Sequence, residues 1–199
     1  MKRRTIDVSG LPTFAFGHRN PVWWGTGAMM LIEGSMFIMM IVSYMYLKGR
    51  NPHWPPGHFA PILFWGTLNT AVMLVSVVPN YIYKQAAERL DLTTMRRWLV
   101  IAIVFAVAFN VIRIFEYGAL NVWWDSNAYG SVVWALLTFH TVHTVTDLVD
   151  SVALCTLMFT GPVNESHFVD VSENAYYWYF VVLAWLPIYV CIYLAPRFA

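Results

Sequence analysis

The sequence predicts an all-α integral membrane protein with five transmembrane helices, and three observations carry this prediction. Of its 199 residues, 59% are hydrophobic and only 12% are charged, whereas soluble domains average about 45–50% apolar and about 25% charged residues. The mean hydropathy is +0.55. Five stretches each reach the roughly 20 apolar residues that a membrane-spanning helix needs. This composition excludes a water-soluble domain, and the net charge of +1 offers no basic excess for nucleic acid.

The five stretches follow one another closely, so we interpret residues 1–199 as a single membrane domain. The first stretch is longer than the apolar core of a signal peptide and lacks a small-residue cleavage site, so we expect a span there. Aromatic residues typical of membrane interfaces mark several ends, for example Trp23, Trp54 and Tyr83. The expected spans are roughly 22–47, 60–83, 98–120, 131–159 and 175–195.

The basic residues predict the orientation of these spans. With five spans, the N-terminus shares a side of the membrane with the loops after the second and fourth spans. Cytoplasmic loops carry an excess of Lys and Arg, which predicts an N-terminus inside and a C-terminus outside. The predicted inner side carries eight of the twelve basic residues, namely Lys2, Arg3, Arg4, Arg19, Lys84, Arg89, Arg96 and Arg97.

The fourth span holds the densest set of titratable residues: His140, His143, Asp147 and Asp150. At 100° per residue these four share an arc of about 80°, so they face the bundle or a hydrated cleft and not lipid. Three interpretations remain open: a buried hydrogen-bonded network, a proton relay or a metal site. A metal would need ligands from a second span, and no clear candidate exists, so we expect none.

Three further charges fall inside spans. Arg113 and Glu116 are three residues apart on the third span, which predicts an internal ion pair; a grip on a lipid headgroup or a partner subunit is the alternative. Glu33 on the first span has no cation nearby in sequence. It is therefore either protonated or bound to a donor on another helix. We interpret the surrounding methionines as packing residues and not as copper ligands.

The common signatures of a reaction centre do not occur in the sequence. It has no phosphate-binding glycine loop, no Ser-His-Asp arrangement, no CxxC motif and no pair of isolated histidines placed to hold a haem between two spans. We therefore expect no catalytic residues in this chain, and the activity of any complex that contains it stays open.

A series of short motifs occurs along the chain in a fixed order. They are Glu33-Gly-Ser-Met-Phe37, Trp54-Pro55-Pro56-Gly57, Asn69-Thr70, Glu116-Tyr117, Phe139-His140-Thr-Val-His143 and Tyr177-Trp178 followed by Trp185. In this order and spacing the chain resembles subunit III of haem–copper terminal oxidases, the cytochrome c oxidase subunit III family, in its shorter five-helix form. The resemblance extends from about Trp23 to the end of the chain.

The chain departs from the family pattern at its polar positions. The last span usually reads Trp-His-Phe-Val-Asp, and here Tyr179 and Val182 replace the histidine and the aspartate. Asp147 stands where a glycine is expected, and Arg113 where a glutamine is expected. These exchanges suggest a rearranged polar network in a divergent branch.

The resemblance implies a non-catalytic, multi-pass subunit of a respiratory, proton-pumping oxidase in a bacterial-type inner membrane. Direct contact with subunit I, proximity to subunit II, and haem and copper held by those partners follow from it, with no nucleic-acid partner. It also implies structural phospholipid in a cleft between the first two and the last three spans, with support of proton uptake there. The residues expected at the cleft or its polar network are Glu33, Arg113, Glu116, His140, His143, Asp147 and Asp150, and those expected to contact partners are Trp54, Asn69, Trp178 and Trp185.

Two alternatives remain. The chain is an accessory or scaffold subunit of another membrane redox complex, resembling a nitric oxide reductase or a respiratory supercomplex, or it is a membrane metalloenzyme that uses the stripe on the fourth span.

Overall fold

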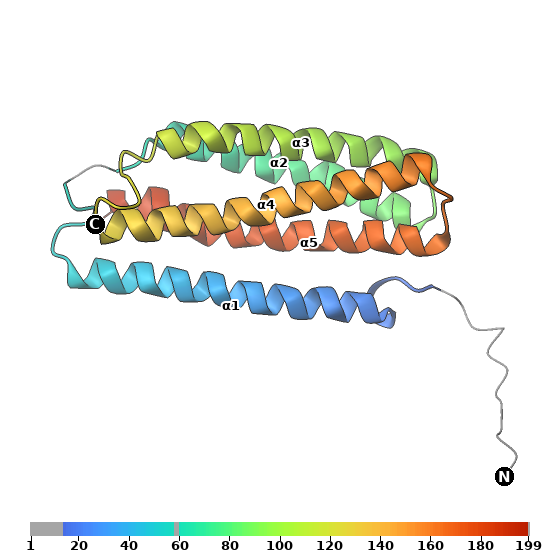
Figure 1. The fold of residues 1–199 in the computed structure, drawn as a ribbon, viewed down its shortest axis with the longest axis horizontal. Coiled ribbons are helices and arrows are strands. Elements are labelled where there is room, and N and C mark those ends of the chain that lie inside the picture. Colours follow the sequence, from blue (N-terminus) through green and yellow to red (C-terminus); the bar gives the residue numbers. More distant parts are fainter. Residues whose placement is uncertain (1–13, 58–59, 199) are drawn as a thin grey trace, which may run out of the picture.

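A computed structural model describes residues 14–57 and 60–198, and five long helices run through this part of the chain (Figure 1). Each is long and apolar enough to cross a membrane, which confirms the predicted fold class. Lys2, Arg3 and Arg4 lie outside the described residues, and the orientation stays a prediction. The helices are α1 (Pro21–Arg50), α2 (Leu63–Glu88), α3 (Leu92–Gly118), α4 (Ala128–Thr160) and α5 (Glu165–Tyr189).

Polar residues immediately before the helices fix where several of them begin. The Asn20 side chain accepts a hydrogen bond from the Val22 amide at 2.9 Å at the start of α1. Asn127 does the same for the Gly130 amide at 2.8 Å at the start of α4. Such caps satisfy backbone N–H groups that have no partner within the helix.

The fifth helix begins ten residues before the expected start of the last span, at Glu165 instead of 175. The backbone amide of Asn164 donates to Nδ1 of His167 at 3.3 Å, which closes the first turn. Its first turns carry polar residues, so an apolar stretch starts later than the helix does. At its other end, α5 continues into a π-helical turn at Val190–Leu194 and a short 3₁₀ helix at Ala195–Arg197.

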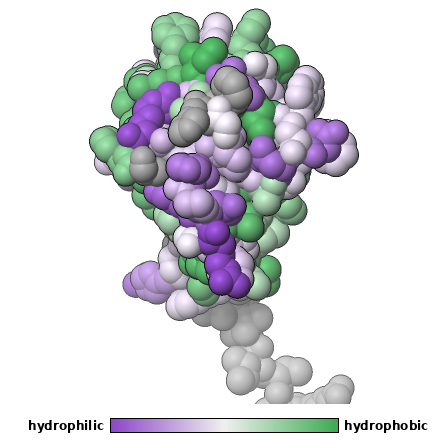
Figure 2. Space-filling model, turned by 90° about the vertical axis from the view of Figure 1, so that its left-hand side faces the viewer, coloured by the Kyte–Doolittle hydropathy of each residue, from purple (hydrophilic) through white to green (hydrophobic). Residues whose placement is uncertain are grey.

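Helices α2 to α5 form a bundle, and α1 lies along one side of it against α4 and α5 (Figure 1). Only Phe37 and Tyr44 of α1 are buried, so most of this helix presents apolar side chains outward. At the end that carries the α1–α2 and α3–α4 loops, hydrophilic residues gather in the middle and hydrophobic residues lie mostly around the edge (Figure 2). This distribution matches a bundle whose ends meet water and whose sides meet lipid.

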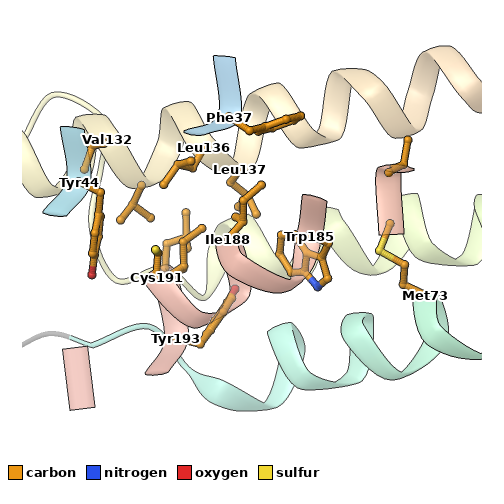
Figure 3. Close-up of a cluster of buried hydrophobic side chains, with 14 of the residues drawn as sticks. Phe37, Tyr44, Met73, Val132, Leu136, Leu137, Trp185, Ile188, Cys191 and Tyr193 are labelled. Atoms are coloured by element: carbon orange, nitrogen blue, oxygen red, sulfur yellow. The ribbon is translucent and has the colours of Figure 1, made fainter. Parts of the chain in front are cut away.

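The largest part of the core packs α4 and α5 against α2 and α1 (Figure 3). Trp185 of α5 and Tyr193 of the π-helical turn point toward α2, and Leu136 of α4 is completely buried in the same cluster. Gly66 on α2 is required by this packing, because a Cβ at that position would overlap the ring of Tyr193. Glycine therefore lets α2 approach the π-helical turn closely.

Candidate functional site

The first polar centre surrounds the carboxylate of Glu116, which is completely buried inside the bundle. Arg113 Nη1 donates to Glu116 Oε2 at 2.8 Å, so the ion pair predicted from the spacing is present. Asn69 of α2 donates to the same oxygen at 2.8 Å. The Tyr193 hydroxyl donates to the other oxygen, Oε1, at 2.6 Å. One carboxylate thus joins three segments of the bundle. We call these four residues, with His140, the Arg113 network.

The guanidinium of Arg113 is also held between two aromatic rings. Its Cζ lies 4.7 Å from the ring centre of Phe109 and 4.1 Å from that of Trp185. Such contacts stabilise a cation in a site without water. Arg113 Nε and Asn69 Oδ1 have no hydrogen-bond partner among the described residues, so the network balances charge without satisfying every polar atom.

His140 belongs to this network through both ring nitrogens. Its Nδ1 lies 3.2 Å from Nη2 of Arg113, and its Nε2 lies 3.1 Å from the carbonyl oxygen of Val181. Arginine can only donate, so Nδ1 accepts and Nε2 carries the proton that it donates to the carbonyl. These contacts assign a neutral imidazole and separate His140 from the other residues of the α4 stripe.

Glu33 meets a donor on another helix, as one of its two interpretations required. The Tyr177 hydroxyl of α5 donates to Glu33 Oε2 at 2.8 Å. Nε2 of His143 lies 3.6 Å from the same oxygen, and Nδ1 of His143 lies 2.6 Å from the carbonyl oxygen of Phe139. This group ties α1 to α4 and α5.

The two aspartates of α4 share one amide on α5. Asn174 Nδ2 lies 3.4 Å from Asp147 Oδ1 and 3.1 Å from Asp150 Oδ2, and it donates to both. Its Oδ1 accepts from the hydroxyls of Tyr83 and Ser151, each at 3.1 Å. With all its hydrogen-bonding capacity in use, the amide has one fixed orientation and holds the two carboxylates close together.

A cavity of about 600 Å³ lies between α1, the C-terminal half of α4 and the N-terminal half of α5. We call it the acidic cavity. Its apolar lining includes Val22, Met29 and Leu154. Asp147 and Glu173 are buried at its wall, whereas Asp150 and Asp170 are exposed at its edge. Five carboxylates line it: Glu33, Asp147, Asp150, Asp170 and Glu173.

Metal binding by the α4 stripe finds no geometric support. Within residues 14–57 and 60–198, no three His, Cys, Asp or Glu side chains are placed to hold one metal ion. The stripe divides instead among three environments, because His140 joins the Arg113 network, His143 faces Glu33, and the aspartates bind Asn174.

The sequence comparisons decide the family. The model of the family described as cytochrome c oxidase subunit III matches residues 12–196. The chain belongs to the cytochrome c oxidase subunit III family. This match confirms the resemblance predicted from the order of the motifs.

Relatives of this chain occur in organisms that are distant from one another, and they align over most of their length. The cytochrome c oxidase subunit 3 of Thermostichus vulcanus is 23% identical, with 91% of this chain and 92% of the relative covered. A probable cytochrome c oxidase subunit 3 of Mycobacterium tuberculosis is 29% identical, with 87% and 88% covered. The cytochrome c oxidase subunit 3 of Pongo pygmaeus is 30% identical, with 94% and 76% covered.

The four residues expected to contact partner subunits are buried in this chain. Trp54, Asn69, Trp178 and Trp185 are exposed by only 7%, 0%, 5% and 0%. Trp178 and Trp185 donate to Ser76 and Thr70 of α2, and Trp54 donates to Tyr44 of α1. Three of these side chains therefore join segments of this chain through hydrogen bonds, and a role at a partner interface stays a prediction.

The expected lipid cleft stays a prediction, and the structure shows where its expected residues lie. The resemblance placed it between the first two and the last three spans, but α2 packs against α3 and α5 within the bundle. The acidic cavity instead separates α1 alone from α4 and α5. Arg113, Glu116 and His140 lie inside the bundle, and only Glu33, Asp147 and Asp150 of the seven expected residues line the cavity.

Sequence reasoning missed the contribution of α5. Asp170, Glu173, Asn174 and Tyr177 all line the cavity. Their spacing of i, i+3, i+4 and i+7 places them on one helical face. This spacing can be read from the sequence, but Asp170, Glu173 and Asn174 precede residue 175, where the expected span begins.

Proposed function

We propose that this chain is a non-catalytic integral subunit III of a haem–copper terminal oxidase, which couples aerobic electron transport to proton translocation. It lies in a bacterial-type inner membrane with its N-terminus inside, and haem and copper belong to its partner subunits. The observation that carries the proposal is the family match over residues 12–196. Five helices suited to a membrane support it.

Direct contact with subunit I is supported by the outer surface of α1. This helix is apolar, and side chains such as Leu31, Ile38 and Met39 are exposed by 77%, 63% and 69%. In a bilayer such a face packs against lipid or against another transmembrane protein. The subunit stabilises subunit I through this contact and lies near subunit II.

Lipid binding and support of proton uptake are supported by the acidic cavity. It combines apolar walls with carboxylates at membrane depth, where ionisable groups are costly and are retained for a function. Glu33 of α1 lines one wall, with Nε2 of His143 3.6 Å from its Oε2, and Asp147 and Asp150 of α4 line another. The carboxylates hold or pass protons near the partner's entrance, and the apolar walls accept an acyl chain.

Removal of this chain from the purified oxidase tests the proposal. We expect the haem absorption spectrum of the remaining complex to be unchanged, while steady-state turnover falls or decays faster. The variants Asp147→Asn and Asp150→Asn should lower turnover in the same way. Asp125→Asn is the matched control, because it removes one carboxylate from the exposed α3–α4 loop. Loss of the haem spectrum on removal, or equal turnover with and without the chain, would contradict the proposal.

A second candidate is an accessory subunit of another membrane redox complex, such as one that reduces nitric oxide. It is favoured by the departures from the family pattern, because the Arg113 network uses an arginine where a glutamine was expected. Oxygen consumption and nitric oxide consumption by the intact complex distinguish the two candidates.

A further inference from the structure

The first half of α1 is loosely attached to the bundle. The buried residues of this helix, Phe37 and Tyr44, both lie in its second half. In the first half, Trp23 stacks on Tyr176 of α5 with 5.4 Å between ring centres. One face of this half lines the acidic cavity instead of packing against α4 and α5, through Val22, Thr26, Met29 and Glu33. The contacts of Glu33 therefore bear on how closely this half approaches the bundle.

Glu33 provides the polar contacts between α1 and the two helices that face it. Within residues 14–57 and 60–198, the bond from Tyr177 is the one hydrogen bond between side chains of α1 and α5, at 2.8 Å. In the same ranges, the contact with His143 is the one ion pair between α1 and α4. Both contacts end on the same oxygen, Oε2. The polar attachment of α1 thus depends on one carboxylate.

The proton of His143 decides whether its contact with Glu33 is attractive. Nδ1 of His143 lies 2.6 Å from the carbonyl oxygen of Phe139, which can only accept, so Nδ1 carries a hydrogen. Nε2, which is 3.6 Å from Glu33 Oε2, therefore carries a hydrogen only in the imidazolium form. The imidazolium attracts the carboxylate, whereas neutral His143 turns a lone pair toward it. Because His143 is buried, water screens this difference only weakly.

The neighbouring titratable groups do not replace this contact. Around the pair, α4 contributes His140, Asp147 and Asp150, and α5 contributes Tyr177, Asp170 and Glu173. The carboxylates and the tyrosine provide no positive charge, and His140 is held as a neutral imidazole by Arg113. No Lys or Arg of the part of the chain that the structure describes lines the acidic cavity. His143 is therefore the cation that can pair with Glu33.

We propose that His143 and Glu33 form a pH-sensitive latch, which fastens the first half of α1 to the bundle when His143 is protonated and releases it when His143 is neutral. An imidazole ordinarily changes its charge between about pH 5 and pH 8. Since only the protonated form attracts Glu33, the latch is closed at lower pH and opens as the pH rises. It thereby controls access to the acidic cavity. Its effect on turnover rests on the proposed function of this cavity, whereas the latch itself does not.

The test measures the distance between α1 and α5 in the full-length chain, reconstituted in lipid nanodiscs. Cys155→Ala and Cys191→Ala remove the native thiols. Spin labels are then attached at Gly27→Cys, where nothing lies near an added Cβ, and at Ser166→Cys, which is exposed. Pulsed electron resonance gives the distance distribution at about pH 6 and about pH 8. We expect a longer second population whose share rises several-fold at the higher pH, and identical distributions would overturn the proposal.

Three variants locate the response. Glu33→Gln and His143→Gln each remove one partner of the latch, so their distance distributions should not depend on pH. Asp147→Asn removes a carboxylate of the same cavity and should leave the response intact. A response that persists in Glu33→Gln, or that disappears in Asp147→Asn, would assign it to other carboxylates and overturn the latch.

Tyr177→Phe provides a milder variant in case the loss of either partner prevents folding. It removes the hydrogen bond to Glu33 and leaves the ion pair in place. The longer population should therefore increase at both pH values and should still rise with pH. An unchanged share of this population in Tyr177→Phe would contradict the role of Glu33 in holding α1.

Nitrogen NMR on isotope-labelled histidine reports the proton itself. The signals of His143 are assigned by their absence in His143→Gln. We expect Nδ1 to keep its hydrogen at both pH values and Nε2 to lose its hydrogen at the higher one. The same protonation of Nε2 at both values would overturn the proposal, even if the distance between the helices changed.

Both measurements are made on the chain itself and are independent of the oxidase assignment. If the native complex holds no haem protein, the proposed function fails, but the pH response of α1 is still measured. If the complex is an oxidase and α1 does not respond to pH, only the latch fails.

Discussion

The Arg113 network and the acidic cavity lie in the same chain, yet they handle charge in opposite ways. In the first, Glu116 is completely buried and receives donors from Arg113, Asn69 and Tyr193. In the second, the buried Asp147 and Glu173 line the cavity and form no ion pair with any residue the structure describes. The Arg113 network therefore pairs its charges within the fold. The carboxylates Asp147 and Glu173 of the acidic cavity have no such ion pair among the described residues.

This difference indicates separate roles for the two regions. Removing one member of a buried ion pair leaves an uncompensated charge and is strongly destabilising. Removing a carboxylate from a group of like charges relieves repulsion. We therefore assign the network to stability of the bundle and the cavity to binding, and substitutions of matched chemistry should separate these roles.

The largest effect is expected for Arg113→Met. It leaves Glu116 buried without its cation, which should lower the free energy of unfolding by about 3–5 kcal/mol. Unfolding in mixed detergent, followed by circular dichroism, measures this change. The double variant Arg113→Met with Glu116→Gln should recover part of the loss, because no uncompensated charge remains. An equal loss in both variants would show that charge pairing is not the cause.

A smaller loss is expected for Gly66→Ala. The added methyl group overlaps the Tyr193 ring and moves its hydroxyl away from Glu116. Forced overpacking of this kind costs about 1–3 kcal/mol. Gly27→Ala is the control, because nothing lies near its added Cβ in α1. Equal stability of the two variants in the same unfolding assay would contradict the close approach of α2 and the π-helical turn.

Asp147→Asn should barely change the stability of the isolated chain. Its hydrogen bond with Asn174 is long, at 3.4 Å, and such a bond contributes about 0.5–1.5 kcal/mol. Relief of repulsion with Asp150 offsets this loss. Glu116→Gln removes the same kind of charge from the Arg113 network and should be far more destabilising. Similar losses in the two variants would remove the distinction between the regions.

The smallest effect concerns Asp91, which caps α3 outside both regions. The hydroxyl and amide of Thr94, with the amide of Thr93, hydrogen-bond its charged form and hold the pKa of Asp91 below its ordinary value of 3.8. Because the pKa is lower in the folded state, the stabilising contribution is present above pH 3.8 and is lost as the pH falls through the folded-state pKa. Asp91→Asn keeps the cap and should remove this part of the acid dependence in a pH series of unfolding curves.

The sequence predicted those features that depend on local spacing. Five helices followed from apolar length, and the Arg113–Glu116 pair followed from a separation of three residues. The donor for Glu33 was predicted only as a possibility, because Tyr177 is 144 residues away along the chain. Contacts at such separation depend on how helices pack, which local periodicity does not determine.

Three features escaped prediction, two because they depend on how distant helices pack and one because hydropathy alone does not detect a polar helix start. Trp178 and Trp185 resemble interface residues in sequence, but the crossing of α5 with α2 turns them inward. The guanidinium of Arg113 lies against Trp185 because α3 and α5 meet the same core. The expected span begins at 175, although α5 begins at Glu165. Mean hydropathy detects only apolar residues, so it does not detect polar residues that lie together on one helical face.

The composition of the native complex tests the central claim most directly. The chain is tagged in its own organism, extracted in mild detergent and purified, and the complex is analysed by visible absorption spectroscopy and by mass spectrometry of its subunits. We predict a haem spectrum that belongs to a larger co-purifying subunit, and the chain separated from that complex should show no haem absorption. A native complex without any haem protein would contradict the assignment of this chain to a terminal oxidase.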